Sequence, residues 1–326
     1  MTAIPRIAEG SAATGGSVRR RRRRSRGRPV WEEPPTTAGL TAKGGTLGLV
    51  LVIILLPIYA IVLTSFSTQG AVNNAGNGLV LWPHGLTLNN YKLIIGGGVV
   101  ARALVISLAI TAVGTAISLA ITILAAYGLS RADSFGHKTI LWTMLITMFF
   151  SGGIIPLFLV VSALGGYDAY WSLILPSAVS VFNIIVMRSF FASAAAEVIE
   201  SARIDGAGDW TILRRIVLPM SKAVTAVIAL FYAVGYWNSW FNIMLFMPAD
   251  SQKWPLQMVL YTYVTEGSSM AGSGTSNVGQ YLGRQQIATV SLQMAVVVLT
   301  LVPIVIAYPF AQRHFTKGVL LGAIKG

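Results

Sequence analysis

Four side-chain amides stand within long apolar stretches of this sequence, and they are its clearest candidates for chemistry. They are Asn183, Asn238, Asn242 and Gln293, and the indole of Trp237 adjoins them. An amide both donates and accepts hydrogen bonds, and an indole offers an apolar face. Such a set suits a ligand with many hydroxyls and exposed C–H faces, such as a sugar. Asn238 and Asn242 are four residues apart, so we expect them to share one helix face.

Two other interpretations of these residues stay open. The amides could hydrogen-bond neighbouring helices, an interaction worth about 0.6 kcal/mol each. The indoles could be anchors at the interface between membrane and water.

The residues that most catalytic and metal sites need are absent or scattered. The 326 residues include no cysteine, and the three histidines, at positions 84, 137 and 314, are far apart in sequence. There is no phosphate-binding Gly-x-x-x-x-Gly-Lys-Ser/Thr loop. The apolar stretches also lack the carboxylates of a proton or sodium relay. We therefore expect no enzyme, no metal site and no cofactor on this chain, and any energy source must be a partner.

The composition indicates the elements that position these side chains. Hydrophobic residues make up 54% of the chain and charged residues 11%, whereas a soluble domain carries about 25% charged residues. Uncharged stretches long enough to cross a bilayer core of about 30 Å recur along the sequence. The sequence predicts an all-α integral membrane protein in which residues 45–326 form six transmembrane helices, near 45–66, 99–127, 139–163, 169–186, 223–247 and 291–312.

The distribution of lysine and arginine predicts the orientation in the membrane. With the N-terminus in the cytoplasm, 20 of the 24 basic residues fall on the cytoplasmic side. Positive charge accumulates on that side in membrane proteins. The sequence therefore predicts a multi-pass protein of the cell membrane with both termini in the cytoplasm.

Residues 1–44 differ from the rest of the chain. They contain the run Arg19–Arg24 and few apolar residues, a composition typical of disorder. We expect a disordered cytoplasmic tail that is attracted to anionic lipid or has no specific role, and we favour this over a nucleic-acid partner.

The cytoplasmic loop at residues 194–219 has an unusual pattern. It holds four of the eleven acidic residues. Its first half suits a short helix that ends near Gly206, and Asp209 could cap a second one, with Trp210, Leu213, Ile216 and Val217 on its apolar side. The sequence predicts a helix–turn–helix that docks into a groove on a partner or lies on the membrane surface.

Three segments of this loop resemble a known family. Glu200-Ser201-Ala202, Asp205-Gly206-Ala207 and Ile216-x-Leu218-Pro219 are similar to the EAA loop of ABC importer permeases, with Ser201 in place of the commoner alanine. The Asp-Gly-Ala form resembles the carbohydrate-uptake branch. Trp82-Pro83 with Asn89-Asn90-Tyr91, the segment 237–241 and the C-terminal residues 315–326 also resemble that branch. The likeness covers residues 45–326.

The resemblance implies a mechanism and a set of partners. The chain would be one of two permease subunits, with two cytoplasmic ATPase subunits that hold ATP and Mg²⁺, and an extracellular binding protein would deliver a sugar. The transport site would alternate between the two sides of the membrane. The ATPase-coupling residues implied are Glu200, Ala202, Asp205, Gly206, Ala207, Leu218 and Pro219.

The sequence raises three alternative functions. An ABC importer could carry another small polar solute, such as a polyamine. A membrane scaffold would need no ATPase. A membrane-embedded enzyme would need a buried acid, base or metal set, which the sequence does not offer.

Overall fold

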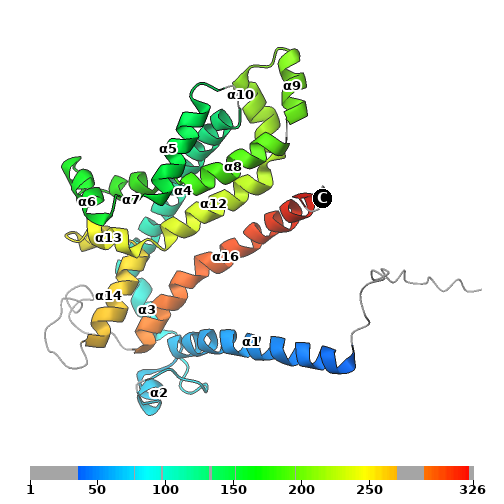
Figure 1. The fold of residues 1–326 in the computed structure, drawn as a ribbon. Coiled ribbons are helices and arrows are strands. Elements are labelled where there is room, and N and C mark those ends of the chain that lie inside the picture. The colour runs from blue at the N-terminus through cyan, green and yellow to red at the C-terminus, as the bar shows by residue number, and fades with distance from the viewer. Residues whose placement is uncertain are drawn as a thin grey trace, which may run out of the picture. The chain divides into compact units, whose positions relative to one another are not determined.

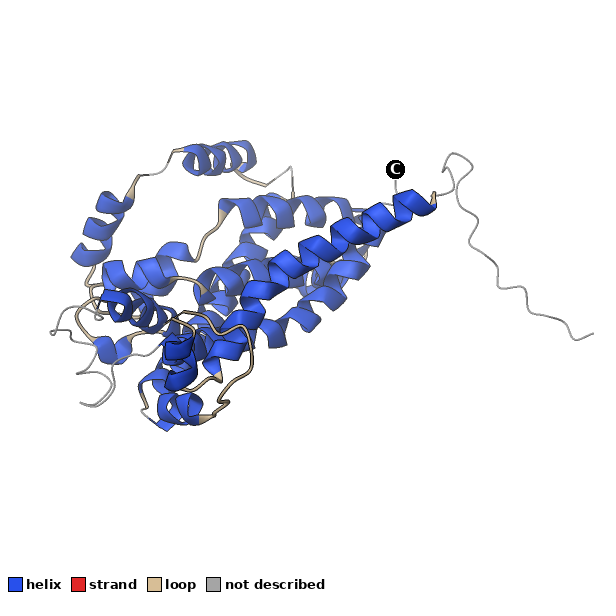
Figure 2. Cartoon of the chain, turned by 90° about the horizontal axis from the view of Figure 1, so that it is seen from below, coloured by secondary structure: helices blue, strands red, loops and turns tan. Residues whose placement is uncertain are grey.

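The computed structural model describes residues 36–322, except 77, 97, 132–133, 151, 195 and 270–289. Within these ranges every regular element is a helix (Figure 2), which confirms the predicted all-α class. The predicted tail up to residue 35, the outer loop from residue 270 and the last four residues lie outside the described residues.

The elements follow one another as shown in Figure 1. The first half of the chain contains α1 (Thr37–Ser65), α2 (Gln69–Asn74), α3 (Asn89–Gly96), α4 (Val99–Leu129), α5 (His137–Phe149) and α6 (Ile154–Ala163). Next come α7 (Trp171–Ile174), the 3-10 turn η1 (Leu175–Ser177), α8 (Val181–Ala194), α9 (Ala196–Ile204), α10 (Asp209–Ile212) and the π-helix η2 (Leu213–Val217). The remainder is α11 (Leu218–Met220), α12 (Lys222–Trp237), α13 (Trp240–Phe246), η3 (Ser251–Lys253), α14 (Leu256–Ser269) and α16 (Val290–Gly322).

Among the described residues, three unbroken helical segments are long and apolar enough to cross a membrane. They are α1, α4 and the part of α16 from Val290 to Pro309. Three bent pairs meet the same test when each pair is taken together, which would bring the number of spans to six. The pairs join α5 to α6, α7–η1 to α8, and α10–α11 to α12, with bends of 114°, 52° and 84°.

The expected continuity of three helices was wrong. The stretch 139–163 breaks before α6, where Gly153 has a φ of +86°. The stretch 169–186 breaks after η1, which contains Pro176, and a proline lacks the N–H that a continuing helix needs. The stretch 223–247 breaks between α12 and α13. Asn238 and Asn242 therefore lie on opposite sides of a helix break, and the expectation that they share a helix face was wrong.

The chain divides into two compact units after Ile54, inside α1. The first unit contributes the beginning of α1, and the predicted domain boundary at residue 44 stays a prediction. The second unit contains the helices from the end of α1 onward. Its larger core is formed by buried side chains of α4, α6, α7, α8, α10, η2, α12, α13 and α14. A second core joins α3, α14 and α16 to the start of α4.

Side chains of α3 hold the end of α1 in the second unit. The Asn90 amide donates to the carbonyls of Ser65 and Ser67, and the hydroxyls of Tyr91 and Ser65 are 2.7 Å apart. This gives a structural reason for the Asn-Asn-Tyr sequence, because two of its three side chains close the loop after α1.

Candidate functional site

A polar cavity of about 250 Å³ lies where α8, α12 and α13 meet the break after η1. We call it the polar cavity. Hydroxyls, amides and aromatic rings surround it, from Ser177, Ser180, Asn183, Phe231, Tyr232, Gly235, Tyr236, Ser239 and Asn242. Asn183 is buried and Asn242 is half-buried. Because such groups pair with hydroxyls and stack on C–H faces, the cavity suits an uncharged, hydroxyl-rich ligand.

Two tyrosines of α12 form the wall of the polar cavity toward α4. The Tyr232 hydroxyl is 2.7 Å from Thr122 Oγ1 and accepts a bond from the Ser180 backbone N–H at 3.3 Å. The Tyr236 hydroxyl donates to the Ile174 carbonyl at 3.0 Å. Its single proton is then used, so it accepts from Ser118 Oγ at 2.8 Å.

These tyrosine contacts satisfy polar groups that the helix break leaves free. Backbone groups at a break lose their helical partners, and a buried polar group without a partner costs free energy. The bonds to Ile174 and Ser180 come from the two sides of the break between α7 and α8. The two tyrosines therefore hold the bent pair in place against α4.

Two glycines shape this region. A Cβ added at Gly114 of α4 would lie 2.8 Å from the Tyr236 ring, so only glycine admits the ring there. A Cβ at Gly235 would meet nothing within 4 Å, and Gly235 lines the polar cavity. The first glycine permits close packing, whereas the second leaves the cavity open.

The other predicted pathway residues lie elsewhere. Trp237 lines a smaller neighbouring cavity of about 10 Å³, which shares Tyr236 and Ser239 with the polar cavity. Asn238 is exposed, and its amide donates to the Val234 carbonyl at 2.9 Å. Gln293 is buried and donates to the Tyr263 carbonyl at 2.8 Å, which is a contact between α16 and α14.

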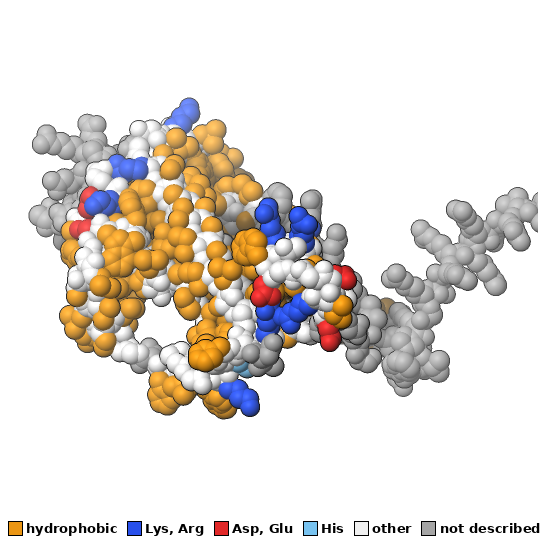
Figure 3. All heavy atoms as spheres, turned by 90° about the horizontal axis from the view of Figure 1, so that it is seen from above, with side chains coloured by type: hydrophobic (Ala, Val, Ile, Leu, Met, Phe, Trp, Pro, Cys, Tyr) orange, Lys and Arg blue, Asp and Glu red, His pale blue; other side chains and the backbone are white. Residues whose placement is uncertain are grey.

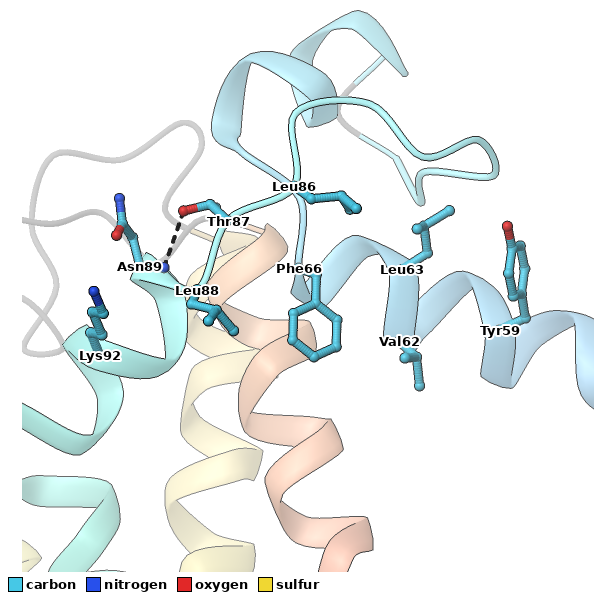
Figure 4. Close-up of a pocket in the computed structure, with 9 residues that line it drawn as sticks. All are labelled: Tyr59, Val62, Leu63, Phe66, Leu86, Thr87, Leu88, Asn89 and Lys92. Carbon is cyan, nitrogen blue, oxygen red and sulfur yellow. Dashed lines mark hydrogen bonds between the residues drawn. The ribbon is translucent and has the colours of Figure 1, made fainter.

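A larger cavity of about 490 Å³ lies between the end of α1 and the segment that leads into α3 (Figure 4). Its lining is mainly apolar, with Val62, Leu63, Phe66 and Leu88 among the contributors. The one hydrogen bond drawn there runs from the Asn89 backbone N–H to Thr87 Oγ1 and is local. Such a lining is typical of a surface that faces lipid or another helix, so the polar cavity is the better candidate for a hydroxylated ligand.

The turn after α9 explains the glycine at position 206. Gly206 has a φ of +82°, a conformation that glycine adopts without strain. Its N–H donates to the Arg203 carbonyl at 3.0 Å, and the Ala207 N–H donates to the Ala202 carbonyl at 2.9 Å. This pair of bonds is a Schellman motif, which ends a helix by using its last free carbonyls. Ala202 and Ala207 are half-buried and pack against the larger core.

The outer surface of α9 and α10 combines charge with exposed apolar side chains. Ile204 is 83% exposed and Trp210 66% exposed. Seen from the end of the second unit that carries these helices, acidic and basic side chains gather beside hydrophobic ones (Figure 3). Exposed charged residues here are Glu200, Arg203, Asp205, Asp209, Arg214 and Arg215. Exposed apolar groups on a projecting segment mark a surface that contacts another molecule.

One ionic contact joins this segment to the end of α4. Arg131 donates from Nη1 to Asp209 Oδ2 at 2.9 Å, and Nη2 pairs with Asp209 Oδ1. The hydrogen bond from Arg131 holds the pKa of the Asp209 carboxyl below its usual 3.8, and the same bond raises the pKa of Arg131. The expectation that Asp209 caps α10 was wrong, because Gly208 occupies the cap position and the carboxylate is turned to Arg131.

The chain is similar in sequence to bacterial transport proteins. It is 39% identical over 282 residues to the polygalacturonan/rhamnogalacturonan transport system permease protein YtcP of Bacillus subtilis, covering 86% of this chain and 96% of the relative. It is 40% identical over 280 residues to Protein LplC of the same bacterium, covering 86% and 92%. The chain belongs to the permease subunits of carbohydrate ABC transporters.

A solved structure supports the same family for the permease. It is described as a bacterial ABC transporter involved in the import of the acidic polysaccharide alginate. One of its chains matches the permease with a TM-score of 0.78 at 26% identity, covering 87% of this chain and 100% of that one. No protein-family model matches the sequence. The resemblance drawn from the EAA loop is thereby confirmed at the level of the family.

The residues predicted for the transport pathway and for ATPase coupling differ in where they lie in the permease. Asn183 and Asn242 meet at the polar cavity, Trp237 lies beside it, and Asn238 and Gln293 line neither cavity. In the predicted coupling set, Ala202, Ala207 and Leu218 pack inward, whereas Glu200, Asp205, Gly206 and Pro219 are exposed.

Several residues of interest were not singled out from the sequence. Tyr232 and Tyr236 are four residues apart on an apolar stretch, a spacing that could have indicated a shared face. No sequence pattern indicates that Ile204 is exposed, since an apolar residue in a short helix is more often buried. Arg131 pairs across 78 positions, and no local pattern reports so distant a partner.

Proposed function

We propose that this chain is a membrane-spanning subunit of an ATP-driven importer for a sugar or oligosaccharide. Alternating access would carry the cargo through the polar cavity. ATP and Mg²⁺ would bind to a separate ATPase and not to this permease. The observation that carries the proposal is the 39% identity with a polysaccharide transport permease over 96% of that relative.

The arrangement in the membrane follows from the charge distribution and the bent helices. We propose six spans, formed by α1, α4, α16 and one from each bent pair, with both termini in the cytoplasm. In the third pair, α12 crosses the membrane and α10 lies outside it. With this orientation α9 and α10 project into the cytoplasm. The loop after α1 and the segment between α13 and α14 face the outside.

The partners are proposed from the surfaces and the relatives. The α9–α10 segment would dock into a cleft of one of two cytoplasmic ATPase subunits, with Ile204 and Trp210 as apolar anchors. Exposed tryptophans are enriched among residues that dominate binding energy. A second permease subunit, most simply a different chain, would complete the pathway. An extracellular binding protein would deliver the cargo.

Purification of the permease from its own membrane in mild detergent tests this function. We expect an ATPase subunit to co-purify and its hydrolysis in proteoliposomes to rise with cargo and binding protein. Trp210→Ala should weaken ATPase binding by roughly thirtyfold, about 2 kcal/mol. Trp82→Ala is the matched control, because Trp82 is also exposed but lies in the outer loop.

Either of two results would contradict the proposal. One is a permease that purifies without any nucleotide-hydrolysing partner. The other is an ATPase that binds the Trp210→Ala variant and the wild type equally well.

A further inference from the structure

The α9–α10 segment is joined to the membrane helices by a covalent route that is bent. After α10 the chain continues as the π-helix η2 and the short helix α11, and then turns by 84° into α12. Neither a π-helix nor a sharp bend repeats the regular α-helical ladder. A displacement of α10 can therefore be absorbed along this route before it reaches α12.

Apolar packing provides a second connection. Ile212, Leu213 and Val217 are buried in the larger core of the second unit. Hydrophobic contact is non-directional, so it holds the segment against the bundle but constrains its angle less than a bidentate ionic contact does.

A polar contact at the first turn of α10 does fix the orientation of α10 relative to α4. The Arg131 guanidinium meets both carboxylate oxygens of Asp209, and its Nη2 also donates to the Tyr127 hydroxyl. That hydroxyl donates to the Asp209 backbone carbonyl at 3.2 Å, and the guanidinium carbon lies 4.7 Å from the centre of the Tyr127 ring. We call these three residues the fork. A bidentate guanidinium–carboxylate pair constrains angle as well as distance.

The α4 end that carries the fork is itself held by neighbouring helices. Arg188 of α8 donates from Nε to the Leu129 carbonyl at 2.6 Å. Its Nη2 lies 3.3 Å from His137 Nε2 at the start of α5. Since a guanidinium only donates, the imidazole nitrogen accepts. The fork therefore ties α10 to a point where α4, α5 and α8 converge.

From the fork, α4 leads directly to the polar cavity. Thr122 and Ser118 lie five and nine residues before Tyr127 on α4. Their hydroxyls bond to the two tyrosines that wall the cavity. Helix α12 packs along α4 through the same contacts (Figure 1). A continuous series of contacts thus runs from Asp209 through α4 to the cavity.

We propose that Arg131, Asp209 and Tyr127 are positioning residues that transmit movement of the α9–α10 segment to α4 and the polar cavity. This inference rests on the proposed function, because it requires an ATPase that moves the segment. In it, Ile204 and Trp210 make the ATPase contact, whereas Arg131 and Asp209 act on the angle of α10. They determine how much of each movement reaches the cavity.

Conservative variants in the intact reconstituted complex test the inference. Arg131→Lys keeps the charge but loses the fork geometry, and Asp209→Asn removes the charge. For both we expect wild-type amounts of bound ATPase, but at least about a fivefold fall in cargo taken up per ATP hydrolysed. Deuterium exchange of the α10 backbone should rise in both. The swapped pair Arg131→Asp with Asp209→Arg should recover part of the uptake per ATP.

Asp250→Asn is the matched control. Asp250 and Lys253 form an ion pair at 3.5 Å within a single short turn, so its loss disconnects no helices and should leave uptake per ATP unchanged. Wild-type uptake per ATP in both Arg131→Lys and Asp209→Asn would overturn the inference while leaving the proposed function intact. A wild-type complex without cargo-dependent hydrolysis would remove the proposed function, and with it this role for the fork.

Discussion

Asn183 and Asn242 come from different helices, and the structure brings them to one cavity. Asn238 is nearer in sequence to Asn242 but lies outside that cavity, since it ends α12 and bonds to its own helix. At the residue scale the two kinds of amide should therefore behave differently, although their chemistry is the same.

Replacing the cavity amides should weaken cargo handling. In Asn183→Leu and Asn242→Leu a hydrogen-bonding group for a hydroxyl is lost. We expect uptake to fall about fivefold to thirtyfold, corresponding to roughly 1–2 kcal/mol. Asn238→Leu is the matched control and should have the smaller effect. Uptake measured in proteoliposomes with equal amounts of assembled complex checks this, and an effect confined to Asn238→Leu would contradict it.

We expect the contribution of the Arg131–Asp209 pair to uptake per ATP hydrolysed to be constant with pH near neutrality. The pKa of the Asp209 carboxyl is lowered by the hydrogen bond from Arg131, so the carboxylate stays ionised above its ordinary 3.8. The contribution of the pair is present above that value and is lost only as the pH falls through the lowered pKa. The ratio of uptake per ATP between wild type and Asp209→Asn should stay constant from about pH 5.5 to 8. A ratio that changes across this range would mean that another group controls the pair.

At the scale of elements, the breaks in the helices create the site. The break after η1 and the break after Trp237 both border the polar cavity, and Ser177, Ser180 and Ser239 lie at them. Irregular backbone at membrane depth is tolerated where protein surrounds it or where it lines a cavity. The interrupted helices thus give the cavity a polar lining that continuous helices would not provide.

Filling the cavity from α12 tests its role. Gly235 lines the cavity and has open space at its Cβ position, so Gly235→Leu should fold and assemble but reduce uptake by about tenfold or more. Gly235→Ala is the matched control, because alanine favours the helix by about 1 kcal/mol and adds a single methyl group. Normal uptake by the leucine variant would show that cargo does not pass through this cavity.

For the whole molecule, the proposed orientation can be tested by labelling, because the chain has no cysteine. Single cysteines at Ser201 and Ser134 should react with a membrane-impermeant maleimide only from the cytoplasmic side. Cysteines at Asn74 and Gln252 should react only from outside. Labelling of intact cells and of inverted vesicles checks this. A cysteine at Ser201 that reacts in intact cells would reverse the orientation.

The sequence by itself determined the class of the molecule and its family. Long uncharged stretches can only be spanning helices in lipid, since the bilayer core leaves backbone groups no partner outside their own helix. Gly206 could be placed from sequence, because the helix end needs a left-handed residue and the bonds that require it lie within six residues. The EAA-like segments were recognisable for the same reason, since they are local.

Only the tertiary structure decided which residues make the site. The polar cavity needs helix breaks in the middle of apolar stretches. The hydropathy of a sequence does not predict where an apolar helix bends. Tyr236 meets Ser118 across 118 positions and Arg131 meets Asp209 across 78. Such contacts depend on how helices pack, and packing is a property of the assembled surfaces. Sequence could therefore predict that this is a carbohydrate permease, whereas the lining of its cavity and the link to its projecting segment required the fold.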